Sequence, residues 1–206
     1  MVKLNPNYAK LSGAYVFPEI GKRAKAFEQS HEGVKIYRLG IGDTTQPITP
    51  HVLKGLNEGV RKLSDKDEYR GYGDEQGDPR LRKAIADYYQ ERNVKIDPSE
   101  VFVSDGAKSD LGNLQHIFAP HSAVAVQDPV YPAYVDTSVM NGLTGPFDPE
   151  DKQYLEMIYL PCTHENNFMP EIPDLRIVKT PGLIYLCSPN NPTGAVMNRN
   201  SLESFV

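Results

Sequence analysis

Short apolar runs alternate with helical patterns through the second half of the chain. Residues 123–126, 155–160 and 183–187 are apolar runs that predict buried strands. Residues 134–140 between the first two runs predict a helix, and Gly142 follows where glycine commonly ends a helix. Strands that alternate with helices favour an α/β fold with a mainly parallel sheet.

Two amphipathic helices are predicted in the first half. Thr49 and Asp78 each precede a proline, which combines a capping side chain with the residue favoured at the first helical position. Apolar residues follow at helical spacing. They are Val52, Leu53, Leu56, Val60 and Leu63 in the first helix, and Leu81, Ile85, Tyr88 and Tyr89 in the second.

The first 32 residues predict an arm rather than a core element. Residues 15–18 should be extended, because a residue before proline avoids the helical region. Residues 21–30 predict a short charged helix, and residues 34–39 alternate apolar and charged side chains as a half-exposed strand does.

Two polar turns follow predicted strands and are the candidate ligand sites. Residues 188–194 (Ser-Pro-Asn-Asn-Pro-Thr-Gly) follow the strand at 183–187, and open α/β sheets bind ligands beyond the carboxyl ends of their strands. Residues 104–109 (Ser-Asp-Gly-Ala-Lys-Ser) follow a predicted strand at 101–103 and open a helix, which suits a phosphate. The apolar pattern of that helix is Leu111, Leu114, Ile117 and Phe118.

Each turn also has a purely structural interpretation. The first could be an ordinary strand-to-helix loop, since Asn, Pro and Gly are common turn residues. The second could be a plain helix N-cap formed by Ser104, Asp105 or Ser109. The P-loop and dinucleotide-binding patterns are both absent from the sequence, so it gives no motif support for nucleotide binding.

Composition narrows the class of protein. The net charge of −5 argues against a nucleic-acid binder. No apolar run reaches membrane-spanning length, and the first residues have no apolar signal core. Two cysteines argue against a disulfide scaffold, and the five histidines lack metal-ligand spacing. We therefore expect a cytoplasmic protein with no metal site.

Five sequence blocks occur in the same order as in fold-type I, pyridoxal-phosphate-dependent aminotransferases of class I/II, which the chain resembles. They are residues 40–45 (Gly-Ile-Gly-Asp-Thr-Thr), 69–73 (Tyr-Arg-Gly-Tyr-Gly), 104–108, 128–134 (Asp-Pro-Val-Tyr-Pro-Ala-Tyr) and 188–194. Residues 15–20, 40–45 and 71–77 are most similar to the LL-diaminopimelate aminotransferase branch. The resemblance extends from residue 5 to residue 206.

The resemblance implies a fold, a domain division and a dimer. The fold is a pyridoxal-phosphate-dependent transferase-like large domain, with a mainly parallel sheet sandwiched by helices and an N-terminal arm. Residues 1–48 would form the arm and the start of the small domain, and residues 49–206 the first part of the large domain. The family shares its sites across a homodimer interface.

The resemblance also assigns residues to the cofactor, pyridoxal 5′-phosphate. The backbone of Ala107 and the main chain or side chain of Lys108 would bind the phosphate. Tyr72 would add a hydroxyl from the other subunit. Tyr131 would stack on the ring, and Asn191 would donate a hydrogen bond to the phenolic oxygen.

A second set of residues would bind the substrate. By the same resemblance, Lys108, Tyr131 and Asn191 would contact the substrate as well as the cofactor. Gly42 would let the backbone approach the amino acid closely, and Tyr15 on the arm would close over the site. Glu75 would bind the distal ammonium of a diamino-dicarboxylate through a charge-assisted hydrogen bond, although a solvated loop carboxylate is the alternative.

The resemblance places the catalytic lysine beyond Val206. In the family, the Schiff-base lysine, the carboxylate partner of the pyridinium nitrogen and the arginine that binds the substrate carboxylate all follow the Asn-Pro-Thr-Gly turn. Residues 200–203 predict a capping box that opens a helix of only one turn. We therefore expect an amino-terminal fragment of about half an enzyme, inactive alone.

The expected reaction of the parent enzyme is transamination in lysine biosynthesis. It would exchange the amino group between LL-2,6-diaminopimelate with 2-oxoglutarate and tetrahydrodipicolinate with glutamate. One alternative is another class I/II aminotransferase that acts on aspartate, alanine or aromatic amino acids. The other is a non-catalytic module that only binds a phosphorylated ligand or dimerises.

Overall fold

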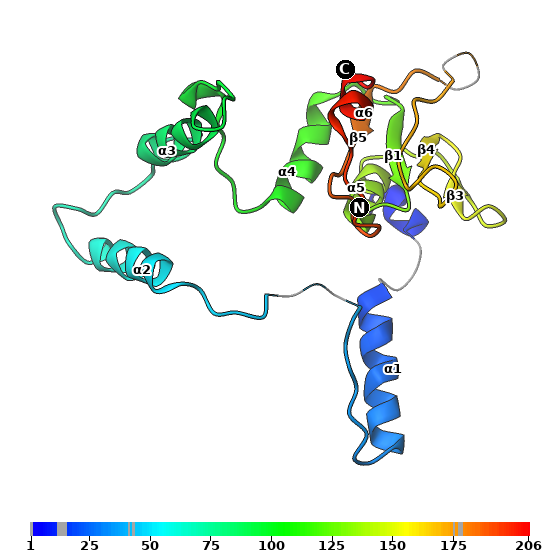
Figure 1. Ribbon diagram of the computed structural model, residues 1–206, viewed down its shortest axis with the longest axis horizontal. Coiled ribbons are helices and arrows are strands. Elements are labelled where there is room, and N and C mark those ends of the chain that lie inside the picture. The colour runs from blue at the N-terminus through cyan, green and yellow to red at the C-terminus, as the bar shows by residue number, and fades with distance from the viewer. Residues whose placement is uncertain (1, 12–15, 41, 43, 175, 177–178) are drawn as a thin grey trace. The chain divides into compact units, whose positions relative to one another are not determined.

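The computed structural model describes residues 2–11, 16–40, 42, 44–174, 176 and 179–206 (Figure 1). The chain divides into two compact units, which are described separately. Unit 1 comprises residues 1–13 and 105–206, and unit 2 comprises residues 14–104.

The described residues form α-helices, short 3₁₀ helices (η) and strands. In chain order these are η1 (Pro6–Lys10), α1 (Val16–Ser30), α2 (Pro50–Leu63), α3 (Pro79–Gln90), η2 (Pro98–Glu100), α4 (Ala107–Leu114), η3 (Gln115–Ile117), β1 (Val124–Asp128), α5 (Pro132–Met140), β2 (Phe147–Asp148), β3 (Gln153–Tyr154), β4 (Met157–Pro161), β5 (Leu183–Tyr185) and α6 (Arg199–Glu203).

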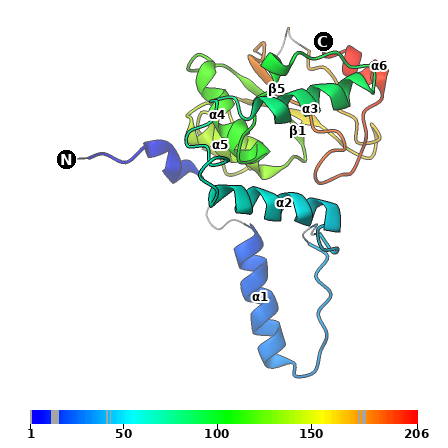
Figure 2. The same ribbon diagram turned by 90° about the vertical axis from the view of Figure 1, so that its left-hand side faces the viewer.

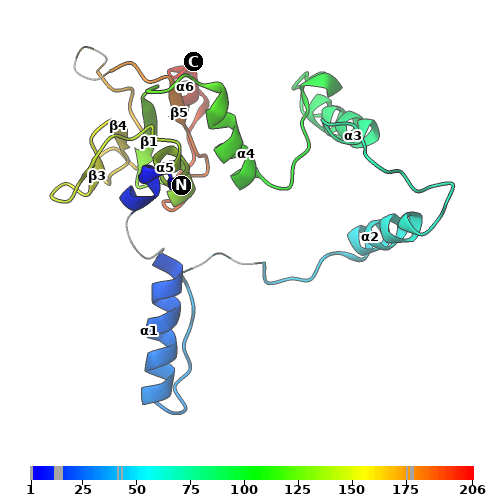
Figure 3. The same cartoon turned by 180° about the vertical axis from the view of Figure 1, so that it is seen from behind.

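A three-stranded parallel sheet forms the centre of unit 1. Its order is β4-β1-β5, so the predicted strand at 123–126 lies in the middle. Val124 of β1 is in register with Met157 of β4 and with Leu183 of β5. A short antiparallel pair, β2 with β3, lies beside β4 (Figure 3).

The core of unit 1 is built around β1. Val124, Ala125 and Val126 are fully buried, as expected for a parallel strand that is covered on both faces. Because successive side chains point to opposite faces, Val124 and Val126 pack with Val139 of α5, whereas Ala125 packs with residues of β4. The helix α5 therefore covers one face of the sheet, and α4 contacts α5 (Figure 1).

The predicted C-terminal end of α5 in unit 1 is confirmed. Gly142 has φ +74° and follows the C-cap of α5, and its N–H donates to the carbonyl oxygen of Val139 at 3.0 Å. Glycine adopts this left-handed conformation without strain, so the helix ends there.

Unit 2 contains α1, α2 and α3, two of which start as predicted. Thr49 Oγ1 accepts from the N–H of Val52 at 3.5 Å, and Asp78 Oδ1 accepts from the N–H of Arg80 at 2.8 Å. Both helices have the predicted apolar pattern, but none of the described residues of α2 is buried. After α1, the chain returns along that helix, where an ion pair joins Arg38 to Glu28 at 3.4 Å (Figures 1 and 2).

Several local predictions were wrong. Residues 34–39 and 101–103 form no strand, because no neighbouring strand is described that could pair with them. The helix α1 begins at Val16 rather than at residue 21. Pro18 is tolerated there because the first turn of a helix has no intrahelical partners for its N–H groups. The cap of α6 is Asn198, which accepts from the N–H of Ser201 at 2.9 Å, rather than residue 200.

The α/β class with a parallel sheet is confirmed by this architecture. The two compact units follow a different division from residues 1–48 and 49–206, and the assignment of those ranges to a small and a large domain stays a prediction. Among the helices of the described residues, none has the length and apolar character needed to span a bilayer.

Candidate functional site

Two of the candidate site loops lie at the same edge of the sheet. The strands β1 and β5 are parallel neighbours, so their carboxyl ends are adjacent. Asn190 Nδ2 donates a hydrogen bond to the carbonyl oxygen of Pro129 at 3.1 Å. This bond joins the loop after β1, which contains Tyr131, to the loop after β5, which contains Asn191.

Asn190 is itself buried, with 3% of its surface exposed. Its Nδ2 also donates to Thr193 Oγ1 at 3.0 Å, and its main-chain N–H donates to the carbonyl oxygen of Ala195 at 2.8 Å. Its Oδ1 is buried and accepts no hydrogen bond from the described residues. A buried unpaired acceptor is uncommon. At this edge of the sheet, Asn190 Oδ1 is therefore available to accept a hydrogen bond from a donor.

The third candidate loop opens α4. Gly106 is the N-cap residue at φ +151° and has no side chain with which to cap the helix. The N-cap position is therefore occupied by Gly106 rather than by Ser104, Asp105 or Ser109. A Cβ at Gly106 would meet no described atom within 4 Å, so the space beside the first turn is open. Ala107 and Lys108 are the first two residues of α4, where the positive end of the helix dipole favours an anion.

Lys108 acts electrostatically on the neighbouring helix α5. Burial raises the pKa of Asp136 above its ordinary value of 3.8, and the positive charge of Lys108 opposes this rise. The helix α4 contacts α5, which starts directly after Tyr131. The Lys108 charge is therefore within electrostatic reach of the helix that Tyr131 opens.

We expect Asp136→Asn to stabilise the protein relative to wild type more strongly at neutral pH than at acidic pH. The folded-state pKa of Asp136 lies above its unfolded value, so the protonated form favours folding at acidic pH. That contribution is lost as pH rises through the folded pKa. Urea unfolding across the acidic-to-neutral range should show a stability difference between variant and wild type that grows with pH. Asp151→Asn, at an exposed loop position, is the control. A pH-independent difference would contradict the assignment.

Tyr131 is half-buried and is the N-cap residue of α5. Its ring lies edge-on to Tyr134, with the centroids 5.8 Å apart and an interplanar angle of 87°. Tyr134 stacks on Tyr185 of β5 at 4.6 Å. Burial, with a hydrogen bond to Cys187, raises the pKa of Tyr134 to about 12, so this phenol stays neutral at any physiological pH.

Three further predicted site residues lie in unit 2. Tyr72 is fully exposed, and Glu75 and Gly42 are also exposed. Tyr15 lies outside the described residues. The structure thus brings Ala107, Lys108, Tyr131 and Asn191 into one compact unit, whereas the place of the unit 2 residues relative to these four stays a prediction.

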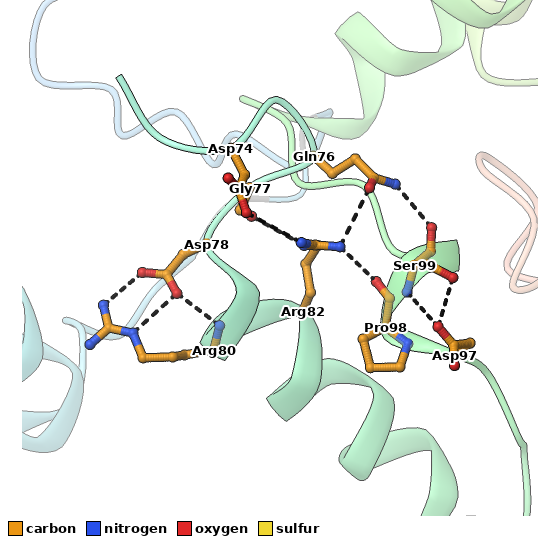
Figure 4. A network of polar contacts seen from close by, with 9 residues as sticks. All are labelled: Asp74, Gln76, Gly77, Asp78, Arg80, Arg82, Asp97, Pro98 and Ser99. Carbon is orange, nitrogen blue, oxygen red and sulfur yellow. Dashed lines mark hydrogen bonds and ion pairs between the residues drawn. The ribbon is translucent and has the colours of Figure 1, made fainter. Parts of the chain in front are cut away.

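The loop that contains Tyr72 and Glu75 is held at its carboxyl end by Arg82 of α3 (Figure 4). The Arg82 side chain is only 14% exposed and lies 3.5 Å from the carboxylate of Asp74. Its guanidinium donates to the carbonyl oxygens of Gly77 at 3.1 Å and Pro98 at 3.2 Å. The sequence analysis missed Arg82. The available signal was its position four residues before the buried Ala86, on the same face of α3.

Sequence reasoning also missed Asn190 and Asp136. Asn190 lies in the same motif as Asn191, and only Asn191 was assigned a role in binding the cofactor and substrate. Both residues are asparagines in a turn. Only the tertiary structure shows that the first is buried and the second exposed. Asp136 occupies a partly buried position in α5 that no sequence pattern marks.

Comparison with known proteins connects this geometry to a family. Residues 34–206 match the family described as aminotransferase class I and II. The chain belongs to this family. The phosphate-favouring start of α4 and the two loops at the sheet edge are therefore parts of a class I and II aminotransferase fold.

Individual relatives indicate which branch of the family the chain is similar to. An LL-diaminopimelate aminotransferase from Lachnospira eligens is 46% identical over 207 residues, covering 100% of this chain and 50% of the relative. One from Desulfosudis oleivorans is 47% identical over 208 residues, covering 100% and 49%. The solved L,L-diaminopimelate aminotransferase from Chlamydomonas reinhardtii has a TM-score of 0.86 and 40% identity, covering 99% of this chain and 49% of that one. The chain thus spans about half the length of these relatives.

The residues of this aminotransferase chain fit the pyridoxal phosphate that the family uses. The open space beside Gly106 and the start of α4 suit a phosphate, and the exposed part of Tyr131 offers an aromatic surface. The described residues contain no group of three or more histidine, cysteine, aspartate or glutamate side chains that could hold a metal.

Proposed function

We propose that this chain provides the cofactor-phosphate and ring-binding half of an LL-diaminopimelate aminotransferase. One observation supports this above all: the start of α4, Tyr131 and Asn191 belong to one compact unit, with two of the three loops hydrogen-bonded at the carboxyl edge of a parallel sheet. The 46% and 47% identity to two such aminotransferases over the whole chain supports the branch.

Each part of the cofactor would be bound by a different group. The N–H of Ala107 and the charge of Lys108 would bind the phosphate, and Tyr72 of a second subunit would add a hydroxyl. Tyr131 would restrain the tilt of the ring, and Asn191 would donate to the phenolic oxygen. When bound, pyridoxal phosphate supplies an electron sink for the bond changes at the substrate Cα.

The proposed substrate has two amino-acid ends. Gly42 would let the main chain approach one end closely, and Tyr15 would cover it, while Glu75 would bind the distal ammonium. Amino-group exchange would proceed between LL-diaminopimelate and 2-oxoglutarate, with glutamate and tetrahydrodipicolinate as the other pair. The assembly we propose is a cytoplasmic homodimer, because Tyr72 would act on the cofactor of the partner subunit.

Titration of the 206-residue chain with pyridoxal phosphate tests the binding role. We expect Lys108→Met and Tyr131→Ala each to weaken binding by about tenfold or more, since each removes one charged or stacking contact. Tyr131→Phe keeps the ring and should bind nearly as well as wild type. Tyr37→Ala, at a tyrosine that is 72% exposed, is the control for tyrosine loss. Equal binding by all variants would reject the proposed site.

Two further readouts separate the rival functions. A hybrid enzyme, in which these 206 residues replace the matching half of the Lachnospira eligens relative, should prefer LL-diaminopimelate to aspartate as amino donor. Equal or better turnover of aspartate would favour another class I and II aminotransferase. Stoichiometric borohydride labelling of one lysine in the 206-residue chain would count against the non-catalytic alternative.

A further inference from the structure

The buried side chain of Gln115 connects the end of α4 to α5 and to β5. Gln115 is 2% exposed, although the apolar pattern of this segment placed Leu114 and Ile117 on the inner face. Those two side chains are instead 48% and 74% exposed. The helix changes from α to 3₁₀ at Gln115, which turns the glutamine inward. A polar side chain buried in this way is stable only when its hydrogen bonds are satisfied.

Both ends of the Gln115 amide have partners. Its Nε2 carries two hydrogens, which are shared among three acceptors: Tyr185 Oη at 2.8 Å, Ser138 Oγ at 3.0 Å and Thr137 Oγ1 at 3.1 Å. Its Oε1 accepts from Asn141 Nδ2 at 2.7 Å. The two hydroxyls donate onward to carbonyl oxygens of α5, so they are available as acceptors. One amide therefore fixes the end of α4 to α5 and to β5.

The bond to Tyr185 reaches the proposed cofactor site through aromatic contacts. The ring of Tyr185 stacks on Tyr134 with an interplanar angle of 18°, and Tyr134 supports Tyr131 edge-on. The main chain adds a parallel link, because the N–H of Tyr134 donates to the carbonyl oxygen of Tyr131 at 3.1 Å. A shift of the Tyr185 ring would therefore move the surface against which Tyr131 rests.

We propose that Gln115 is a positioning residue that sets the orientation of Tyr131 through Tyr185 and Tyr134. The proposal deepens the proposed function and rests on it where it concerns pyridoxal phosphate. Gln115 itself contacts neither cofactor nor substrate. Its effect is to keep the Tyr131 ring in one orientation before the cofactor binds, which reduces the conformational entropy lost on binding.

The first test uses the ligand-free chain. Tyrosines labelled in the ring give separate NMR signals, and Tyr131→Phe identifies the Tyr131 signal. We expect Gln115→Leu to shift or broaden that signal. Tyr185→Phe, which keeps the ring and removes only the hydroxyl, should do the same. In the Gln115→Leu, Tyr185→Phe double variant the change should be no larger than in either single variant, because both remove the same link.

The second test measures pyridoxal phosphate affinity and the circular dichroism of the bound cofactor. Gln115→Leu should weaken binding by about tenfold, corresponding to the loss of one net hydrogen bond, and should change the dichroism per bound cofactor. Tyr154→Phe is the matched control. It removes a buried phenol hydroxyl of unit 1, which donates to the carbonyl oxygen of Lys10 at 2.8 Å rather than to a residue of the tyrosine stack. It should lower stability and leave both cofactor readouts unchanged.

The outcomes separate the two proposals. An unchanged Tyr131 signal in both Gln115→Leu and Tyr185→Phe would overturn the positioning role, even if wild type binds pyridoxal phosphate. If the signal moves but wild type does not bind the cofactor, the proposed function fails and the positioning of Tyr131 stands. If Tyr154→Phe changes the cofactor readouts as strongly as Gln115→Leu, general destabilisation explains the effect and the proposal is wrong.

Discussion

Asn190→Ala is expected to lower the free energy of unfolding of unit 1 by about 2 kcal/mol, because it removes two side-chain hydrogen bonds in a buried position. The carbonyl oxygen of Pro129 would lose its bond from the Asn190 side chain. The unpaired Oδ1 of Asn190 disappears in the same change, which offsets part of the loss. The loops containing Tyr131 and Asn191 would no longer be tied together, so the affinity for pyridoxal phosphate should also fall.

The neighbouring Asn191 provides the comparison. It is exposed, so Asn191→Ala should leave unfolding in urea close to wild type and reduce only cofactor affinity. Asn190→Asp tests the direction in which stability changes with pH. A buried carboxylate without a cation has a raised folded-state pKa, so this variant should be least destabilised below about pH 4 and more destabilised as pH rises. Equal stability of the Asn190 and Asn191 alanine variants would show that the Pro129 bond does not hold the loops.

Gly77→Ala is expected to unfold the local structure around the loop that contains Tyr72 and Glu75. Gly77 has φ +102°, which side chains rarely adopt, and an added Cβ would lie 2.6 Å from Cβ of Val103. Strain and overlap together should cost about 3 kcal/mol. The N–H of Val103 donates to the carbonyl oxygen of Gln76 at 2.9 Å, so this bond reports directly on the change.

Hydrogen exchange of the Val103 amide measures this effect. Protection should fall by about 100-fold in Gly77→Ala. Gly73→Ala is the control, because it lies in the same loop and a Cβ there would meet nothing within 4 Å. If Gly77→Ala retained wild-type protection, the close contact with Val103 would not exist in solution, and the Arg82 contacts alone would hold the loop.

The sequence predicted the sheet core and the positions of the loops well. Continuous apolar runs identify β1 and β5, because a parallel strand covered on both faces leaves no polar alternation. The helix starts at Thr49 and Asp78 were equally predictable, since capping depends on a side chain and the N–H groups just after it. The assigned cofactor residues came from motifs, and their roles stay predictions.

Predictions from the local sequence pattern failed where the structure of a segment depends on a partner that is distant in the chain. Residues 34–39 and 101–103 have strand-like sequences, but a strand exists only where another pairs with it. Nothing near Gln115 in the sequence marks it as buried, because its partners Tyr185 and Ser138 are 70 and 23 residues away.

By itself, the sequence therefore determined the fold class, the caps of α2 and α3 and the order of the site loops, because these follow from interactions between residues close in the chain. The tertiary structure alone decided that Asn190 is buried beside Pro129, that Arg82 holds the loop ending at Gly77, and that Gln115 fixes Tyr185. Each of these polar groups has at least one hydrogen-bond partner 16 or more residues away in the chain, and such partners stabilise it in its partly or fully buried position.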